Sequence, residues 1–175
     1  NKKIGFHKLS FQIIENKIIV NTQINMVVKL GPIPVFKYLH EGEETWINNE
    51  FVKAKTYTKK NNREFNFLAH RKGKKIEIES RGKKFNVTED TLITSYWQKN
   101  WLKKKILIDS QNGKKRLINV EKMDIEPIKV EDLVIYAQKY KVTGTQDKPN
   151  GKKIDYDIWY DDKDRWVKIK FFIKK

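Results

Sequence analysis

The sequence lacks cysteine altogether and contains only four prolines, eight glycines and three histidines among its 175 residues. Without cysteine the chain forms no disulfide, holds no zinc through thiolates and has no cysteine nucleophile. It also contains no run of about 18 apolar residues, so we expect no membrane-spanning helix. Neither a glycine-rich phosphate loop nor a nucleophile elbow around a serine is present in the sequence. These absences remove the common signatures of catalysis, and we predict no catalytic residue.

The histidines are too scattered to suggest a metal site. His7, His40 and His70 form no HxH or HxxxH spacing and fall in different segments of the chain. A metal site would need two or three of these ligands to converge. We therefore predict neither a bound metal nor any other cofactor.

Arginine is scarce although the protein is strongly basic. The net charge is +16, yet only five of the 38 basic residues are arginine, namely Arg63, Arg71, Arg81, Arg116 and Arg165. Nucleic-acid contacts favour the bidentate guanidinium group, and the lysines are spread along the whole chain instead of clustering. The composition therefore predicts a solvated basic surface. It argues against nucleic acid as the partner and favours an anionic membrane surface among charged partners.

Most of the chain alternates apolar and polar residues with a period of two, which is typical of half-buried β-strands. Between Ile18 and Leu30, for example, every even position except Thr22 is apolar, and turn signals separate such segments. The pattern predicts about ten to twelve strands. They cover Ile4–Ile14, Ile18–Leu30, Val35–Ile47, Phe51–Lys59, Glu64–Arg71, Lys75–Ser80, Phe85–Val87, Ile106–Ser110, Arg116–Ile125, Val130–Thr143 and the two arms of Asp155–Phe172, and an Asn112-Gly113 hairpin turn precedes the strand that begins at Arg116.

Residues 88–104 depart from this alternation. Thr88 is a suitable N-cap, Glu89 and Asp90 would lie in the first helical turn, and lysines close the segment. Trp97 and Trp101 are four residues apart and would share one face of a helix. The segment therefore predicts the one short helical piece of the chain.

The strand count determines the predicted architecture. One helix cannot cover both faces of so many strands, so the sheet must bury its apolar side against itself. We predict an all-β, mainly antiparallel fold in which a single strongly curved sheet forms a barrel or half-barrel. The helical segment around residues 88–104 would plug its interior. No linker or internal repeat interrupts the sequence, which predicts one domain over residues 1–175.

The segment Asp155–Phe172, DYDIWYDDKDRWVKIKFF, places aromatic and β-branched residues at alternate positions beside charges. It predicts two amphipathic strands joined by a turn at Asp161–Asp164. Asp155 and Asp157 would share one face at roughly 6–7 Å, which is within the range for two-carboxylate chemistry. Lysines on neighbouring strands favour a surface salt-bridge ladder over catalysis.

One group of candidate ligand-binding residues lies in the predicted strand Val35–Ile47. Tyr38, His40, Glu44 and Trp46 occupy alternate positions and would share one face. They would either line the mouth of a pocket or form an exposed polar face, and the pattern favours the exposed face.

A second group of candidates surrounds the predicted helix. Tyr96, Trp97 and Trp101 place three large rings in a short stretch, and Tyr156 of the closing hairpin is a further candidate. These rings would plug a cavity, line its rim, or pack as an ordinary core.

Four stretches of the sequence resemble one family. DIWYDDKDRWVKIKF is similar to the closing hairpin of an uncharacterised bacterial family of exported proteins, a domain-of-unknown-function group that tends to end in Leu-Trp-Tyr-Asp and Gly-Arg-Trp-Val-Lys. TSYW (Thr94–Trp97), LIDSQNGK (Leu107–Lys114) and the opening IGFHKLSF resemble its other segments, in the same order. Asp164 stands where that family usually has glycine.

The resemblance implies an antiparallel, strongly curved sheet, distantly like the lipoprotein-carrier half-barrels of the bacterial envelope. It also implies export to the periplasm or cell surface, and it brings no catalytic residue. The chain begins at Asn1 instead of Met. Together these features lead us to expect a periplasmic or secreted protein from which a signal peptide has been removed.

Several functions remain open at this point. The first hypothesis is a non-enzymatic envelope protein that binds an apolar or lipid-like ligand, or a partner chain, in the concavity of the curved sheet. The second is a basic module that binds single-stranded nucleic acid, which requires lysines and exposed rings on one face. The third is an enzyme with an unidentified pocket chemistry around His40 or around Asp155 and Asp157. A purely structural role is the fourth.

Overall fold

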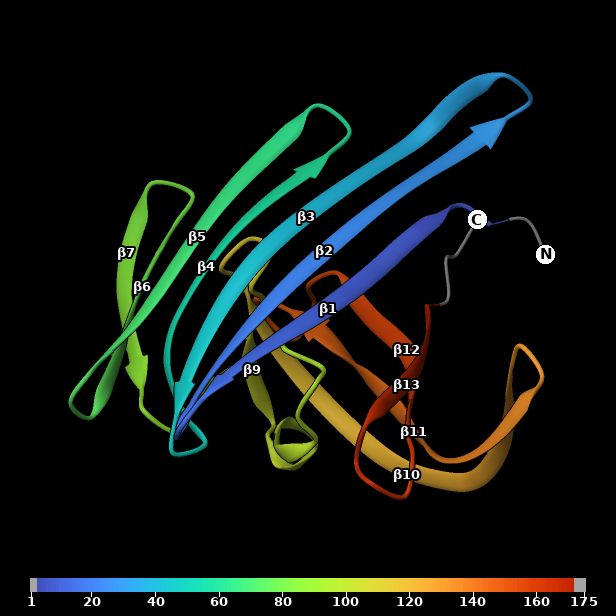
Figure 1. The fold of residues 1–175 in the computed structure, drawn as a ribbon. Coiled ribbons are helices and arrows are strands. Elements are labelled where there is room, and N and C mark those ends of the chain that lie inside the picture. The colour runs from blue at the N-terminus through green and yellow to red at the C-terminus, as the bar shows by residue number, and fades with distance from the viewer. Residues whose placement is uncertain (1–2, 172–175) are drawn as a thin grey trace. The chain divides into compact units, whose positions relative to one another are not determined.

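The computed structural model describes residues 3–171, and within that range the chain forms thirteen strands and one short 3₁₀ helix (Figure 1). The strands form one sheet of seven and one of six. The chain divides into two compact units, Asn1–Asp90 with Ser110–Gly113, and Thr91–Asp109 with Lys114–Lys175. The prediction of an all-β, mainly antiparallel fold is confirmed, whereas the prediction of a single sheet is wrong.

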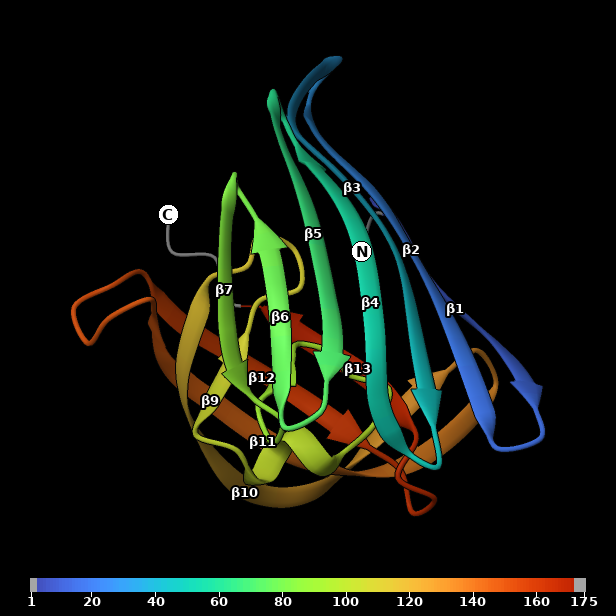
Figure 2. The same cartoon turned by 90° about the vertical axis from the view of Figure 1, so that its left-hand side faces the viewer.

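The first sheet is an antiparallel meander in which strands follow one another in sequence order, as Figure 2 shows. Each strand is therefore hydrogen-bonded to its neighbours in the chain. The strands are β1 (Gly5–Ile14), β2 (Lys17–Leu30), β3 (Ile33–Ile47), β4 (Glu50–Lys60), β5 (Arg63–Lys72), β6 (Lys75–Ser80) and β7 (Lys83–Thr88).

All six connections in this sheet are two residues long. Such short turns are specified by local sequence, so the turn residues indicated where the strands end. Two-residue hairpin turns need a positive φ at their first residue, a conformation that Gly and Asn adopt readily. The first turn residue has a φ between 51° and 60° in every case, at Glu15, Gly31, Asn48, Asn61, Gly73 and Arg81. The gap between the predicted strands Ile18–Leu30 and Val35–Ile47 contains the β2–β3 turn, which is Gly31-Pro32, and β3 begins earlier than predicted, at Ile33.

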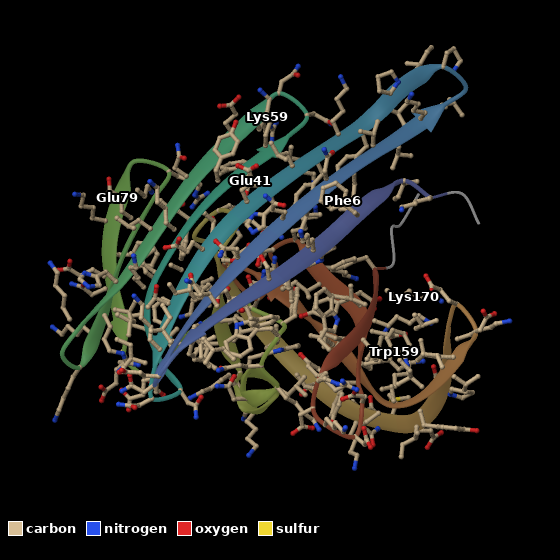
Figure 3. The ribbon with its side chains drawn as sticks, viewed as in Figure 1. Phe6, Glu41, Lys59, Glu79, Trp159 and Lys170 are labelled. Carbon is tan, nitrogen blue, oxygen red and sulfur yellow. The ribbon has the colours of Figure 1, made fainter. Side chains whose placement is uncertain are left out.

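Alternation divides the first sheet into an apolar face and a charged face. The register places Val20, Ala54, Ala69 and Ile78 in one row across β2, β4, β5 and β6, and these four side chains are at most 1% exposed. Neighbouring rows of this apolar face include Phe67 and Ile76. The opposite face carries Glu41, Lys59 and Glu79, which Figure 3 shows projecting from the ribbon.

The second sheet has the order β13-β12-β11-β10-β9-β8, and its β8–β9 pair is parallel whereas the others are antiparallel. Its strands are β8 (Leu92–Ile93), β9 (Ile106–Ile108), β10 (Lys115–Val130), β11 (Leu133–Gln146), β12 (Lys153–Tyr160) and β13 (Trp166–Phe171). The predicted closing hairpin is confirmed up to Phe171, and Phe172 lies outside the described residues.

One proline and one turn explain where the end of β10 and the start of β11 differ from the prediction. β10 continues through Pro127 to Val130, and Glu131 begins the next turn with a φ of 53°. Pro127 is tolerated because β9 pairs with β10 only from Lys115 to Leu117, so that β10 has a neighbour on one side at the proline.

The predicted helix over residues 88–104 is largely wrong. Thr88 ends β7 instead of capping a helix, Leu92–Ile93 forms β8, and only Asn100–Lys103 forms a 3₁₀ helix, η1. The β-branched residues around Ile93 lose rotamer freedom in a helix and instead pair with β9. Trp97 lies outside η1, so it does not share a helix face with Trp101.

The core of the second unit gathers around Trp101. Trp101, Leu107, Val142, Ile158 and Tyr160 are at most 1% exposed and belong to one apolar cluster. They come from η1, β9, β11 and β12, so residues about sixty positions apart meet in this core.

Open strand orders leave two edges in each sheet, β1 and β7 in the first and β13 and β8 in the second. Within the described residues, therefore, neither sheet closes into a barrel by hydrogen bonding. The half-barrel and the single domain over residues 1–175 stay predictions.

Ile158 and Ile125 provide a matched test of these core assignments. Ile158 is completely buried whereas Ile125 is 63% exposed. We expect Ile158→Ala to lower the free energy of unfolding by about 2–5 kcal/mol, because it deletes buried methyl groups and leaves a cavity. Ile125→Ala should change it by about 0.5 kcal/mol or less. Urea unfolding measures both, and equal losses would contradict the assignment.

Candidate functional site

The seven sequence candidates fall into two groups in different units. Tyr38, His40 and Trp46 lie on β3 of the first sheet. The second group, Tyr96, Trp97, Trp101 and Tyr156, belongs to the second unit.

The β3 residues share a face as predicted, but that face is buried and not exposed. Tyr38, His40, Glu44 and Trp46 are between 3% and 8% exposed. His40 Nδ1 lies 2.8 Å from Thr58 Oγ1, and Trp46 Nε1 donates a hydrogen bond of 2.9 Å to Glu44 Oε2. The prediction of an exposed polar face is wrong because alternation shows which residues share a face but not which face is covered.

A partly exposed extension continues from the β3 row toward the β2–β3 turn. We call it the apolar strip and define it as Ile24, Met26, Val28, Phe36 and Tyr38. Met26 pairs with Tyr38 and Val28 with Phe36 across the two strands, and all except Tyr38 are half-buried. The Phe36 and Tyr38 rings stack at 6.3 Å. The strip therefore presents adjacent apolar side chains on a fixed sheet.

Cationic side chains border the apolar strip. Lys60 pairs with Tyr38 on β3 and with Arg63 on β5, so both cations belong to the row of the apolar face that contains Met26. Lys60 Nζ lies 5.5 Å from the centre of the Phe36 ring. Lys60 and Arg63 are exposed. An amphiphile whose tail covers the strip would thus meet positive charge at its end.

Three of the four second-unit candidates meet in one aromatic cluster. The Tyr96 ring lies 5.6 Å from Trp101, 6.0 Å from Tyr156 and 5.9 Å from Trp166. Trp101 and Tyr156 are buried, whereas Tyr96 and Trp97 are partly exposed. The arrangement is that of a packed core, and a role in ligand gating stays a prediction.

Tyr160 completes this cluster and was not a sequence candidate. Its hydroxyl accepts a hydrogen bond of 2.9 Å from Trp101 Nε1 and donates one of 2.8 Å to the carbonyl of Tyr96. Burial raises the pKa of Tyr160 and of Tyr156 above the ordinary tyrosine value. Both hydroxyls therefore remain protonated, and neither is a base at neutral pH.

A buried ion pair lies next to the cluster. Arg116 Nη2 lies 2.6 Å from Asp109 Oδ2, and the two side chains are 13% and 1% exposed. Burial alone would lower the pKa of Arg116, but the charge of Asp109 and the adjacent Tyr96 and Tyr156 outweigh it and raise that pKa. Gln146 Nε2 donates to the same Asp109 oxygen at 3.2 Å. The arginine is fixed in place and remains charged.

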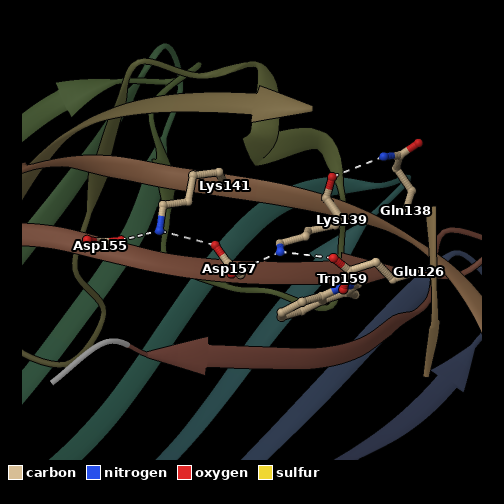
Figure 4. Close-up of polar contacts among 7 residues, drawn as sticks. All are labelled: Glu126, Gln138, Lys139, Lys141, Asp155, Asp157 and Trp159. Atoms are coloured by element: carbon tan, nitrogen blue, oxygen red, sulfur yellow. Dashed lines mark hydrogen bonds and ion pairs between the residues drawn. The ribbon is translucent and has the colours of Figure 1, made fainter. Parts of the chain in front are cut away.

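The opposite face of the second sheet carries a ladder of charges, which Figure 4 shows. Lys141 Nζ lies 2.5 Å from Asp155 Oδ1 and 3.4 Å from Asp157 Oδ1. Lys139 Nζ lies 3.5 Å from Asp157 Oδ2 and 3.1 Å from Glu126 Oε1. The predicted salt-bridge ladder is confirmed, except that Asp157 is only 5% exposed and thus not on the surface.

Trp159 anchors one end of this ladder. Its Nε1 donates a hydrogen bond of 3.0 Å to Glu126 Oε2. Lys168 and Lys139 place their ammonium groups 4.6 Å and 5.4 Å from the centre of its ring. Acid–base work by Asp155 and Asp157 is disfavoured because lysines from β11 neutralise both carboxylates.

The closing turn is organised by one carboxylate. Asp161 Oδ1 accepts the backbone N–H groups of Lys163 and Arg165 at 3.0 and 2.8 Å, and its Oδ2 accepts from Arg165 Nε at 2.7 Å. Burial would raise the pKa of Asp161, but these hydrogen bonds outweigh it and hold the pKa below its usual value. Asp164 has a φ of 58°, a conformation that glycine adopts without strain.

The described residues contain neither a metal-binding cluster nor a membrane-spanning helix. Among residues 3–171, no His, Asp and Glu side chains gather in a group of three that would hold a metal ion. No helix in that range is long and apolar enough to cross a membrane.

Sequence reasoning missed Arg116 and Asp109, and it missed the apolar strip as a unit. The available signal for the ion pair was the Asn112-Gly113 turn, which brings the residues before and after it to the same end of a hairpin. The signal for the strip was the even-numbered apolar run of Ile18–Leu30, whose partner residues on β3 depend on the register.

Comparison with known proteins identifies a family for this chain and no individual relative. A sequence model described as a domain of unknown function (DUF6134) matches residues 1–174 of the chain. No curated protein and no solved structure matches it.

The Arg116–Asp109 pair allows a test by double-mutant cycle. We expect Asp109→Asn or Arg116→Met alone to lower the free energy of unfolding by about 3–5 kcal/mol, because each leaves the other group buried without its full partner. The double variant should lose less than the sum of the two. Strict additivity in urea unfolding would show that the pair is not coupled.

Asp161 predicts a pH dependence of stability. Because its folded pKa lies below the unfolded value of about 3.9, its contribution is present above about pH 4 and is lost as the pH falls through the folded pKa. Asp161→Asn should cost about 1–3 kcal/mol at pH 6 and reduce the loss on acidification.

The exposed neighbour Asp162 provides the control for this prediction. Asp162→Asn should retain the pH profile of the wild type when unfolding in urea is followed from about pH 6 to about pH 2. Identical profiles for Asp161→Asn and the wild type would contradict the proposed role of the turn.

Proposed function

The chain belongs to the DUF6134 family of domains of unknown function, and we propose that it is a non-enzymatic protein of the bacterial envelope that binds an apolar, lipid-like ligand on the first sheet. The observation that carries the proposal is the apolar strip, where half-buried side chains from β2 and β3 adjoin without charge between them. Covering such side chains releases about 25 cal/mol per Å² of apolar surface.

The border of the strip defines the class of ligand. Lys60 and Arg63 are exposed in the strip's own row, and the whole chain carries a net charge of +16. A ligand with an apolar tail and an anionic head satisfies both features, whereas a neutral hydrocarbon uses only one. A fatty acid or an anionic phospholipid has this chemistry, and an anionic membrane surface would present it.

The shape of the first sheet supports the same proposal. Figure 2 shows its long strands curving together along their length. A curved sheet of this kind is what the half-barrel and the likeness to lipoprotein carriers require, and placement in the periplasm or outside the cell belongs to the same proposal. A partner chain that lays apolar side chains on the strip is the competing occupant.

The contacts of the basic and aromatic residues weigh against the alternatives. All five tryptophans lie within the described residues and none is exposed, so stacking of nucleic-acid bases on tryptophan is disfavoured. Lys139 and Lys141 are engaged by acidic side chains. The enzyme hypothesis loses support because the carboxylates Asp155 and Asp157 are neutralised in the ladder.

The proposal is tested by measuring the affinity of the protein for oleate by calorimetry. Native mass spectrometry of the purified protein would detect a lipid that it retains. Met26→Glu should weaken oleate binding by about tenfold or more, because it puts a carboxylate into the strip. Asn25→Glu adds the same group to the charged face of the same strand and should leave binding unchanged. Equal effects of the two substitutions would contradict the proposal.

The role of the cation is tested separately. Lys60→Gln should weaken the binding of oleate. It should leave the binding of oleyl alcohol unchanged, because that ligand has the same tail without the charge. Sedimentation with phosphatidylglycerol and phosphatidylcholine vesicles distinguishes a membrane surface from a free lipid. Failure of the protein to bind oleate, oleyl alcohol and both vesicles would overturn the proposal and leave the partner chain as the occupant.

A further inference from the structure

β1 differs from the other terminal strands of the two sheets. It is ten residues long, whereas β7 has six residues, β8 has two, and β13 has six within the range 3–171 that the structure describes. Four of its exposed side chains are large and apolar, since Phe6 and Phe11 are 50%, Ile13 71% and Ile14 48% exposed. A long apolar edge strand is a template for pairing with another strand. Figure 3 shows Phe6 on this strand.

Charge distinguishes β1 from the other edges as well. β7 begins with Lys83 and Lys84, and β13 carries Lys168 and Lys170, whereas Lys8 is the only charged residue of β1 apart from any charge on His7. Edge lysines prevent strand pairing in natural sheets. β8 carries no charge but has only two residues. In a chain of net charge +16, β1 is therefore the terminal strand, among those longer than two residues, at which two copies approach with least repulsion.

We propose that β1 pairs with β1 of a second copy of this chain, in an antiparallel and two-fold symmetric arrangement that joins the two seven-stranded sheets. This inference goes beyond the proposed ligand binding and does not depend on it. Two-fold pairing is closed, so it produces a dimer and not a fibre.

The hydrogen-bond pattern of the β1–β2 hairpin supports such a pairing. Ile14 and Lys17 flank a two-residue turn, and residues in that position exchange their backbone hydrogen bonds. The carbonyl of Ile4 likewise accepts from the Val27 amide at 2.8 Å. Even-numbered residues thus bond to β2, whereas Leu9 and Ile13 direct their backbone groups toward the outer side of the sheet.

One register is self-complementary over nearly the whole strand. If Ser10 lies on the two-fold axis, Leu9 faces Phe11 of the other copy, Phe6 faces Ile14, and Lys8 faces Gln12. Aromatic and branched side chains then meet as favourable cross-strand pairs, and the two Lys8 ammonium groups avoid each other. Each residue also meets a partner of the same parity, so the apolar face continues across both sheets.

Pairing with another edge of a second copy is less favourable. A β1–β7 or β1–β13 contact would be heterologous and would bring two lysines from the short strand against β1. A heterologous contact leaves one β1 edge exposed and continues into an open assembly. The sequence of β1 therefore favours β1 of a second copy as its pairing partner.

Charge reversal at the axis tests both the edge and the register. Sedimentation equilibrium of the purified chain should show a monomer–dimer equilibrium. Ser10→Lys and Ser10→Glu should each raise the dimer dissociation constant by roughly fivefold, because each places like charges opposite each other. An equimolar mixture of the two variants should form a heterodimer, detected by native mass spectrometry, at least as tight as the wild-type dimer.

Three further variants complete the test. Asn66→Lys adds the same charge to the same face four strands away and should leave the dissociation constant unchanged. Gln12→Glu should tighten the dimer by facing Lys8. Leu9→Pro removes an outward N–H that the β1–β2 ladder does not use and should yield a folded monomer.

Two results would overturn the proposal. The first is a wild-type chain that stays monomeric up to millimolar concentration. The second is a dimer whose dissociation constant is the same for the wild type, for Ser10→Lys, for Ser10→Glu and for their mixture. Neither result bears on oleate binding, so failure of the dimer and failure of the proposed function are distinguishable.

Discussion

Pairing register is the constraint on which the rest of this structure depends. Successive side chains of a strand point to opposite faces, so a shift of one residue would exchange the two faces of the sheet. Six consecutive two-residue turns set the register of the first sheet, and each begins with a residue of positive φ. A slip at the β2–β3 turn would carry Met26 and Val28 to the charged face. The apolar strip therefore depends on the register that the β2–β3 turn sets.

Register also explains how polar groups are accommodated on the apolar face. His40 and Thr58 are direct cross-strand partners, and this places their polar atoms 2.8 Å apart. Glu44 and Trp46 are two residues apart on β3 and therefore side by side on one face, where the indole donates to the carboxylate. Burying such groups without partners would cost several kcal/mol each. Because these polar groups bond to one another, the buried face of β3 accommodates them without an unpaired buried polar atom in either pair.

Much of the strand pattern was predictable because alternation and turn residues are local signals. The strand at Lys75–Ser80 was predicted to the residue, and the Asp161–Asp164 turn lies between β12 and β13 as expected. The division into two sheets was not predictable, because alternation does not show that β7 ends one sheet and that Leu92–Ile93 instead pairs in parallel with β9. The helix signals around Thr88 are local, and the structure forms the strand pairing with β9 in place of the predicted helix.

The candidate site was less predictable than the fold for a related reason. Alternation grouped Tyr38, His40 and Trp46 correctly on one face but gave no information on whether that face is covered. The Arg116–Asp109 pair required the geometry of a loop between β9 and β10 that local patterns do not specify. Asp155 and Asp157 were grouped correctly because they are two residues apart on β12, and Lys141 of β11 lies directly across from Asp157.

The surplus of lysine and the shortage of charge on β1 have a joint consequence. A net charge of +16 repels copies of the chain from one another over about 8–10 Å at ordinary ionic strength. Such repulsion is weakest where a strand carries little charge and where symmetry separates the charges that remain. β1 meets both conditions, since Lys8 lies two residues from the Ser10 axis. The lysines on β7 and β13 thus disfavour association at those edges, whereas β1 permits it. The basic composition of the chain therefore makes the proposed contact specific to β1.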